Sequence, residues 1–294
     1  MATPRRLLMN PAFSEVFHCT SRCVRRAFLC GWDPASGRDF EHRRLWIDER
    51  ISELALYFGI SVISSSVMSN HFHIILRTEP QWVASLSDAE VARRWLCVFP
   101  GPGGRRGHPP EAQAIEDLCL DTKKLALCRS RLSDISWFMR SLNEPIARRA
   151  NAEDECTGRF WEGRFKCRRL DGDAAIHACL IYFDLNPVRA GMVAEARQHP
   201  WSSHRHYIGQ VSDRRLSPPS VYWGLGNTPF AREAAYTELV HAGQSMAQQG
   251  AITDATLHGW ALGDAAFTAE LQKRTPRRIT PAKPGRPPST PPES

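Results

Sequence analysis

Residues 41–77 constrain the fold more than any other part of the chain, because a helical hydrophobic pattern changes there to an extended one. Over residues 41–58 the apolar positions recur every three or four residues, which predicts an amphipathic helix that stops near Gly59. Two β-rich runs follow, at residues 60–67 and 72–77, with a turn-like Met-Ser-Asn between them. The segment therefore predicts a helix packed on a sheet, followed by two adjacent strands.

A further strand is expected before this segment. Residues 16–20 alternate so that Phe17 and Cys19 share one face, and the strand runs into the basic residues 22–26. A second amphipathic helix is expected over residues 135–146, capped by Ser133 or Asp134 and kinked at Pro145. The order of elements is then strand, helix, strand, strand, helix.

The chain divides into a compact part and appendages. A Pro- and Gly-rich basic loop at residues 100–110 and a helical stretch at 88–98 interrupt the core and look like an insertion. The tail is rich in Pro, Thr, Lys and Arg and is expected to be disordered. We assign an N-terminal arm (1–12), a catalytic domain (13–205) with an insertion at about 80–132, a helical extension (206–273) and a basic tail (274–294).

Composition narrows the class of protein. A formal charge of +7 and a pI near 9.1 over 294 residues favour polyanionic partners without identifying them. No apolar run is long enough to span a bilayer and the N-terminus lacks a signal-peptide pattern, so we expect a cytoplasmic, nucleoid-associated bacterial protein. The nine cysteines form no paired ladder and are expected to be reduced and mostly structural.

His71 and His73 form the most informative chemical motif. Residues i and i+2 of a strand project from the same face, so both imidazoles converge while Phe72 points into the core. Imidazoles bind Mn²⁺ or Zn²⁺ and can serve Mg²⁺ where a substrate phosphate adds oxygen ligands. The alternative is a pair of surface histidines on an edge strand.

Tyr182 is the second candidate. It lies in a helix expected to begin near Asp171 or Asp173 and to end before Pro187, which places the tyrosine in the last turn. A phenol can attack phosphorus and hold DNA as a phosphotyrosine, although its ordinary pKa near 10 requires a metal or base nearby. The alternative is a core tyrosine with its hydroxyl at the rim.

Residues 158–169, GRFWEGRFKCRR, alternate aromatic and basic side chains in a stretch expected to be extended. Cations can contact phosphates while aromatic faces stack on unpaired bases. The alternative is a strand with Phe160 and Phe165 buried and a solvated basic face. The residues expected to bind nucleic acid are Arg22, Arg25, Arg26, Arg159, Trp161, Arg164, Lys166, Arg168 and Arg169.

Taken together, four motifs resemble the HUH-type single-tyrosine transposases, in the branch associated with repetitive extragenic palindromes. The resemblance covers about 190 residues, roughly 13–203, and the motifs that carry it are VMSNHFHIIL at 67–76, GRFWEGRF at 158–165, YFDLNPVRAG at 182–191 and WSS at 201–203. The resemblance implies an α+β fold, an RRM-like (ferredoxin-like) antiparallel sheet of four to five strands with helices on one face. It also implies that His71 and His73 hold Mg²⁺ or Mn²⁺ and that Tyr182 is the nucleophile.

The implied activity is that of a transposase. Tyr182 would cleave single-stranded or hairpin DNA, form a 5′-phosphotyrosine and rejoin ends without a nucleotide cofactor or a membrane, as a monomer or a homodimer. The family commonly has a third, polar metal ligand one helical turn before the tyrosine. This chain departs from that pattern, because Ala178 occupies the position. His177 is one residue from that position, about 100° around the helix, and Asp184 faces away from Tyr182 by a similar calculation. The third metal ligand would then be Glu162, His18 or a water molecule.

Three other functions fit parts of the pattern. A domesticated hairpin-binding protein would keep the basic face and bind DNA without metal or cleavage. An RRM-type RNA-binding module would use the same sheet. The expected strands, however, lack the aromatic RNP pattern that stacks on RNA bases, and His71 and His73 would have no role. A metallohydrolase would use a metal-bound water, would form no covalent adduct and would leave Tyr182 without a role.

Overall fold

A computed structural model describes residues 12–24, 29–34, 36–101, 103–243 and 249–254, together with residues 260, 262, 268–269, 272–273 and 280. The expected nucleic-acid ligands Arg25 and Arg26 lie outside the described residues, as do nearly all of the N-terminal arm and of the basic tail.

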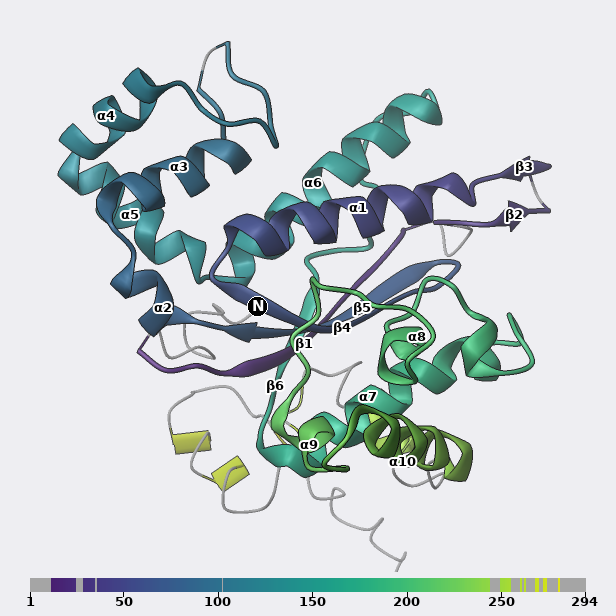
Figure 1. The fold of residues 1–294 in the computed structure, drawn as a ribbon. Helices are drawn as coiled ribbons and strands as arrows, with labels where there is room; N and C mark the ends of the chain where they lie inside the picture. The colour runs from purple at the N-terminus through teal and green to yellow at the C-terminus, as the bar shows by residue number, and fades with distance from the viewer. Residues whose placement is uncertain are drawn as a thin grey trace, which may run out of the picture.

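The centre of the molecule is a four-stranded antiparallel sheet with the strand order β4-β5-β1-β6 (Figure 1). The strands are β1 (Val16–Arg22), β4 (Ile60–Val67), β5 (His71–Thr78) and β6 (Lys166–Leu170). One helix, α1 (His42–Tyr57), connects β1 to β4, and a second, α6 (Ile135–Glu153), precedes β6. This connectivity and order are those of the predicted RRM-like α+β fold, so the fold class is confirmed.

The two faces of the sheet are both covered. Phe17, Cys19, Phe72 and Ile74 point to the face where α1 and α6 pack, as the alternation in β1 and β5 predicted. The opposite face, which includes Ile75, packs against α7 (Gly172–Arg189). Helices therefore lie on both faces, and the expectation of helices on one face alone was incomplete.

The helix α7 continues past the predicted end. It includes Pro187 and ends at Arg189, whereas the prediction placed its end before the proline. A proline removes one amide donor and disfavours the helical region for the residue before it, yet the Ala190 amide donates to the Asn186 carbonyl at 2.9 Å, so helical bonding continues across the proline. Tyr182 consequently lies nearly two turns from the end of the helix rather than in its last turn.

Gly59 follows α1 for a packing reason. The helix ends at Phe58, which is extended, and the Gly59 amide donates to the Leu132 carbonyl at 2.8 Å. A Cβ atom on Gly59 would lie 2.0 Å from a methyl group of Val83. The predicted stop is thus in the right place, but a close approach rather than a left-handed turn requires glycine there.

The insertion forms a helical unit with a hydrophobic core of its own. Its helices are α2 (Pro80–Ser85), α3 (Asp88–Val98), α4 (Ala112–Leu120) and α5 (Thr122–Leu132). Val91, Trp95, Leu125 and Leu132 are among the side chains that make up its core. The predicted helix at residues 88–98 is confirmed at both ends.

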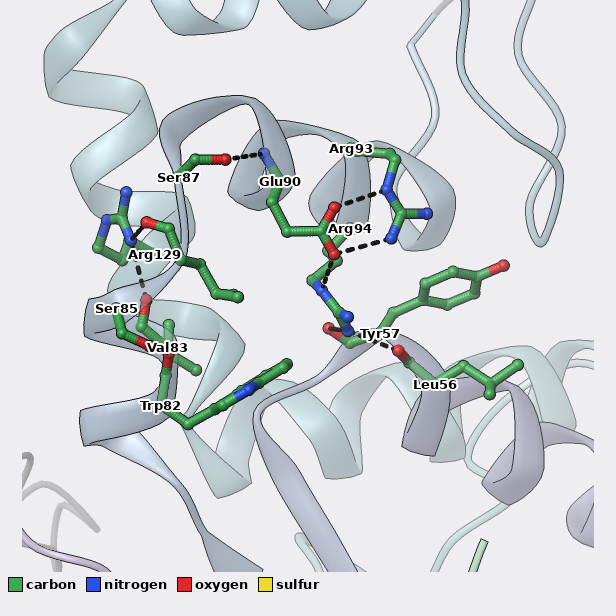
Figure 2. Close-up of polar contacts among 11 residues, drawn as sticks. Leu56, Tyr57, Trp82, Val83, Ser85, Ser87, Glu90, Arg93, Arg94 and Arg129 are labelled. Atoms are coloured by element: carbon green, nitrogen blue, oxygen red, sulfur yellow. Dashed lines mark hydrogen bonds and ion pairs between the residues drawn. The ribbon is translucent and has the colours of Figure 1, made fainter. Parts of the chain in front are cut away.

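Half-buried arginines tie this insertion to α1 and hold its own helices together (Figure 2). Arg94 donates to the Glu90 carboxylate at 2.5 Å and to the Leu56 carbonyl at 2.6 Å, at the C-terminal end of α1. A cation at that end also complements the helix dipole. Arg129 donates to the carbonyls of Val83 and Leu86, which ties α5 to the loop between α2 and α3.

A small ribbon and a group of later helices lie outside the central sheet and the insertion. A two-stranded ribbon lies between β1 and α1 and consists of β2 (Trp32–Asp33) and β3 (Arg38–Asp39). After α7 come a 3₁₀ helix (Ala196–Gln198), α8 (His204–Tyr207), α9 (Ser220–Trp223) and α10 (Pro229–Ala242). In Figure 1 these later helices gather beside α7.

His199 is expected to make stability depend on pH. Its Nε2–H donates to the Val67 carbonyl at 3.1 Å, and burial, with a smaller contribution from Arg44, lowers the pKa of His199 to about 4. Since the unfolded imidazole titrates near 6.5, the stabilisation is complete above pH 6.5 and is lost as the pH falls towards 4. We expect His199→Gln to remove about 3 kcal/mol of this pH dependence.

Urea denaturation at several pH values between 7 and 4.5 measures the effect. His241→Gln, at an exposed position on α10, is the matched control and should leave the wild-type pH profile in place. An unchanged slope of unfolding free energy against pH in His199→Gln would contradict the assignment.

Candidate active site

The histidine pair lies on an interior strand. β5 is flanked by β4 and β1, so the reading of His71 and His73 as surface residues of an edge strand is wrong. Both imidazoles project towards α7, while Phe72 between them is fully buried on the other face. The two Nε2 atoms are 2.9 Å apart, and the Nδ1 atom of His71 lies 2.6 Å from the Asn70 side-chain oxygen.

A third imidazole stands behind the pair. His18, on β1, is 1% exposed, and its Nε2 lies 2.9 Å from His73 Nδ1. Phe183 packs against the rings of both residues, with centroid distances of 4.9 and 5.0 Å. His18 therefore contacts the nitrogen of His73 that points away from His71, and it supports the pair rather than extending it.

Burial keeps this row of imidazoles neutral. Desolvation, followed by the charge of Arg22, lowers the pKa of His71 to about 4. Desolvation also lowers the pKa of His73 and of His18 well below the ordinary value, with nearby positive charges adding to the effect. Neutral imidazoles have a free ring lone pair, which is the form that binds a metal ion.

Tyr182 reaches the same place from α7. Its ring is perpendicular to that of His73, with the centroids 6.0 Å apart. The Arg189 guanidinium lies over the tyrosine ring at 4.5 Å, and the hydroxyl is 3.4 Å from the Thr253 hydroxyl. The structure therefore brings together the three residues that the sequence singled out for chemistry.

A pocket of about 430 Å³ opens over these residues. Exposed cations on its wall come from the end of β1 and from the loop that leads into β6. The residues that line it are Thr20, Ser21, Arg22, His71, His73, Glu162, Gly163, Arg164, Lys166, Tyr182, Asn186 and Thr253. Acceptors, imidazoles, a phenol and cations thus surround one cavity.

Two further side chains in the pocket could act as metal ligands, and one earlier candidate could not. Glu162 and Asn186 line the pocket, and Asn186 lies one helical turn after Tyr182, on the same side of α7. The sequence-based prediction considered only the turn before the tyrosine, although Asn186 stands at a spacing of four after it. Asp184 faces away from the pocket, as its helical position predicted, and it bonds to His204 and Tyr236. Among the described residues no group of three His, Cys, Asp or Glu side chains could hold a metal.

The predicted nucleic-acid ligands have different environments. Arg22, Arg159, Arg164 and Lys166 are exposed. Arg169 is ion-paired with Glu15 at 2.6 Å. Arg168 is 3% exposed and donates to the Ile252 carbonyl and to Cys179, so this arginine is internal and its assignment to the DNA surface is corrected.

Trp161 requires a second correction. Its side chain is 9% exposed, packs edge-on against Phe72 and Phe160, and donates from Nε1 to the Asn143 carbonyl at 2.9 Å. Of the segment expected to be extended, residues 166–169 belong to β6, and residues 160–162 are bonded to residues 22–24 around an isolated antiparallel bridge between Cys23 and Trp161. The alternative of buried aromatics with an exposed basic face describes this stretch better.

Comparison with known proteins gives one neighbour to report. No family model and no curated protein matches the chain. A solved structure, that of the REP-associated tyrosine transposase bound to a REP hairpin, matches over 75% of this chain and 93% of that chain, with 13% identity and a TM-score of 0.43. A similarity of this size carries no activity across, so the chemistry has to come from this chain's own residues.

One further finding concerns the membrane. In the part of the chain that the structure describes, no helix is both long and apolar enough to cross a bilayer.

The corrected position of Trp161 leads to a prediction. Trp161→Phe loses the indole bond to Asn143 and leaves unfilled volume, so we expect a loss of about 1–3 kcal/mol in the free energy of unfolding. Binding of hairpin DNA by the folded variant should stay within about twofold of wild type. Chemical denaturation and a binding titration measure the two effects, with Arg164→Ala as the control that weakens binding while preserving stability. Lost affinity at unchanged stability would instead indicate stacking on a base.

Proposed function

We propose that this protein cleaves and rejoins single-stranded hairpin DNA, with Tyr182 as nucleophile and a divalent metal held by His71 and His73. The observation that carries the proposal is the shared pocket, in which the histidine pair and Tyr182 face one cavity whose wall is cationic. The histidines come from β5 and the tyrosine from α7 of the same chain. A catalytic site assembled in this way needs no residue from a second copy.

The histidines fit a divalent ion. The two Nε2 atoms are 2.9 Å apart, within hydrogen-bond distance of one another, and both rings line the pocket, so a divalent ion held by both lone pairs would take the place of the proton shared between them. For both Nε2 lone pairs to be free, both Nδ1 atoms have to carry protons. Acceptors for those protons are present, since Asn70 Oδ1 faces His71 Nδ1 and His18 Nε2 faces His73 Nδ1.

Asn186 and Glu162 are the residues that could complete such a site. Oxygen ligands suit Mg²⁺ and Mn²⁺, and both side chains line the pocket. A bound ion would polarise the scissile phosphate and neutralise charge that develops on it. His18 is excluded as a direct ligand by its position behind His73.

The reaction at Tyr182 is an exchange of phosphate esters. The phenol oxygen forms a bond to the scissile phosphorus, the bond from phosphorus to the 3′ oxygen breaks, and the phenol proton is balanced by the proton taken up at the released 3′-hydroxyl. The 5′ end remains attached as a phosphotyrosine. Because the ester bond is conserved, attack by a 3′-hydroxyl reverses the step and joins strands without a nucleotide cofactor.

The exposed cations would hold the DNA. Arg22, Arg164 and Lys166 lie at the pocket, and Arg159 is exposed nearby in the chain. Contacts of this kind bind phosphates without reading sequence and weaken as salt is raised. They support the coarser part of the proposal, a DNA-binding protein, independently of cleavage.

The first test replaces the nucleophile. Tyr182→Phe removes one oxygen, so we expect the protein-linked DNA band on a denaturing gel to disappear while hairpin affinity stays within about threefold. The substrates are end-labelled single-stranded hairpin oligonucleotides from the flanks of the gene, with Mg²⁺ or Mn²⁺. Tyr236→Phe is not a suitable control because its hydroxyl contacts α7, so Tyr222→Phe serves instead.

The possible outcomes separate the rival functions. A metal-dependent adduct that is absent in Tyr182→Phe establishes the nucleophile. Tight hairpin binding without an adduct in any metal would indicate a domesticated binding protein, and cleavage without an adduct would indicate attack by water. Stronger binding of RNA than of hairpin DNA would favour an RNA-binding module.

The second test concerns the ion alone. Asn186→Ala should weaken Mn²⁺ binding about 10–100-fold if the amide oxygen is a ligand, and His73→Ala should weaken it further. Titration calorimetry or Mn²⁺ magnetic resonance on DNA-free protein measures this without cleavage. Glu162→Gln tests the other candidate, and Asn151→Ala, outside the pocket, is the control. Equal affinity in wild type and His73→Ala would rule out the histidine site.

A further inference from the structure

Asp184 is a buried carboxylate only two residues after Tyr182. It is 1% exposed, and its Oδ2 accepts a 2.6 Å bond from the Tyr236 hydroxyl and a 2.8 Å bond from His204 Nδ1. Its Oδ1 lies 3.4 Å from the Ser202 hydroxyl. A carboxylate in such a position is costly unless it is fully bonded, so removal of a partner should be felt by the helix that carries it.

The partners of Asp184 belong to the segment after α7, and that segment is also bonded to the sheet. Along the edge strand β4, the Ser203 amide donates to the Ser65 carbonyl at 2.9 Å, and the Val67 amide donates to the Trp201 carbonyl at 2.9 Å. The hydroxyl of Tyr207 donates to the Ile63 carbonyl at 2.6 Å, beside the irregularity in β4. The segment is therefore fixed to the same sheet that holds the histidines.

These bonds form a bracket between the sheet and α7. One end of the bracket is the edge of β4 and the other is the Asp184 carboxylate, with residues 201–207 and Tyr236 of α10 between them. The Tyr207 and Tyr236 rings pack at 5.2 Å, which connects its two ends. The bracket sets the distance and the rotation of α7 relative to β5.

Rotation of α7 decides where Tyr182 points. Residues i and i+2 of a helix are about 200° apart around its axis, so holding Asp184 on one side turns Tyr182 to the other, where the histidines lie. Phe183 packs on His18 and His73 between the two. Catalytic groups have to be held within about 0.5 Å and 10–20° of the productive geometry, and neighbouring packing and hydrogen bonds supply that support.

We propose that Asp184 and Tyr236 are positioning residues for Tyr182, and that the helical extension through α10 is needed to place the nucleophile rather than to bind DNA. This inference rests on the proposed function in naming Tyr182 as the nucleophile. The physical claim about α7 is separate, because Tyr236 and Asp184 fix the helix whether or not the phenol attacks phosphorus. Neither residue touches the DNA or the pocket in this assignment.

The experiment compares matched hydroxyl deletions. Tyr236→Phe removes the bond to Asp184, whereas Tyr222→Phe removes a bond from the same tyrosine cluster to the Tyr207 carbonyl. Each substitution therefore removes one hydrogen bond made by a buried tyrosine hydroxyl. At saturating hairpin DNA and Mn²⁺, we expect Tyr236→Phe to lower the single-turnover rate of adduct formation about 10-fold and Asp184→Leu about 100-fold, as for a nucleophile displaced by about 1 Å.

Two readouts distinguish positioning from loss of folding. The hairpin Kd should remain within about twofold in every variant, and Asp184→Asn, which keeps acceptor oxygen for Tyr236, should recover part of the rate lost in Asp184→Leu. Tyr222→Phe should retain the wild-type rate. Equal rates in Tyr236→Phe and Tyr222→Phe, per folded molecule, would overturn the proposal.

Hydrogen exchange keeps the inference testable if the wild-type protein forms no adduct. In DNA-free protein, amides of residues 180–186 should exchange faster in Tyr236→Phe than in Tyr222→Phe or wild type. If wild type forms no adduct but residues 180–186 exchange faster in Tyr236→Phe, the proposed function is wrong and the positioning role stands. If exchange across α7 is unchanged in Tyr236→Phe, the positioning role is wrong and the proposed function is unaffected.

Discussion

The 2.9 Å separation of His71 Nε2 and His73 Nε2 is the constraint around which the rest of the site is arranged. Side chains two residues apart on a strand share a face, but they meet at this distance only when both rings are oriented from outside. Asn70 orients the first ring and His18 the second. Because β5 is an interior strand, its backbone is fixed by ladders on both sides, and the pair has little freedom to spread.

This arrangement has a cost that the surrounding packing has to offset. Among the described residues, no hydrogen-bond partner is found for the buried Nδ1 atom of His18. An orphaned buried polar atom costs about 1–3 kcal/mol, whether it carries a proton or a lone pair. Phe183 contacts both His18 and His73, so apolar burial against α7 helps to hold the imidazoles together. The helix thus contributes to the site through Phe183 as well as through Tyr182.

The strand at residues 60–67 was predicted well because clear turn residues bound it on both sides and its apolar residues are β-branched. The strand there has the predicted bounds. Periodicity also predicted that Phe72 and the two histidines face opposite ways, because that depends only on the pleat. It says nothing of which element covers each face. The packing of α7 over the histidines is a long-range contact that no local pattern contains.

The errors at individual residues have the same origin. Trp161 and Arg168 stand among exposed basic residues in the sequence, yet one fills the core beside Phe72 and the other lies beneath α7. Pairing with β1 and with the residues after it decides which side chains turn inward: Arg168 lies opposite His18 in the register of β6, and Trp161 forms an isolated bridge with Cys23. The end predicted before Pro187 followed from the preference of the residue before a proline, but the helix continues, and the Ala190 amide bonds to the Asn186 carbonyl. Asn186 lines the pocket one turn after Tyr182, whereas the prediction considered only the turn before the tyrosine.

The positive charges around the pocket divide into two groups that act differently. Arg22, Arg164 and Lys166 are exposed, so water and salt screen their attraction for phosphates. Arg168 is buried opposite His18 in the register of β6 and β1, where the lower dielectric makes its field stronger and salt reaches it poorly. That field opposes protonation and helps to lower the pKa of His18 and of His73. Arg168 does not lie on the DNA surface, but it still affects the site. It helps to keep the imidazoles neutral, and the proposed metal requires the lone pairs of neutral imidazoles.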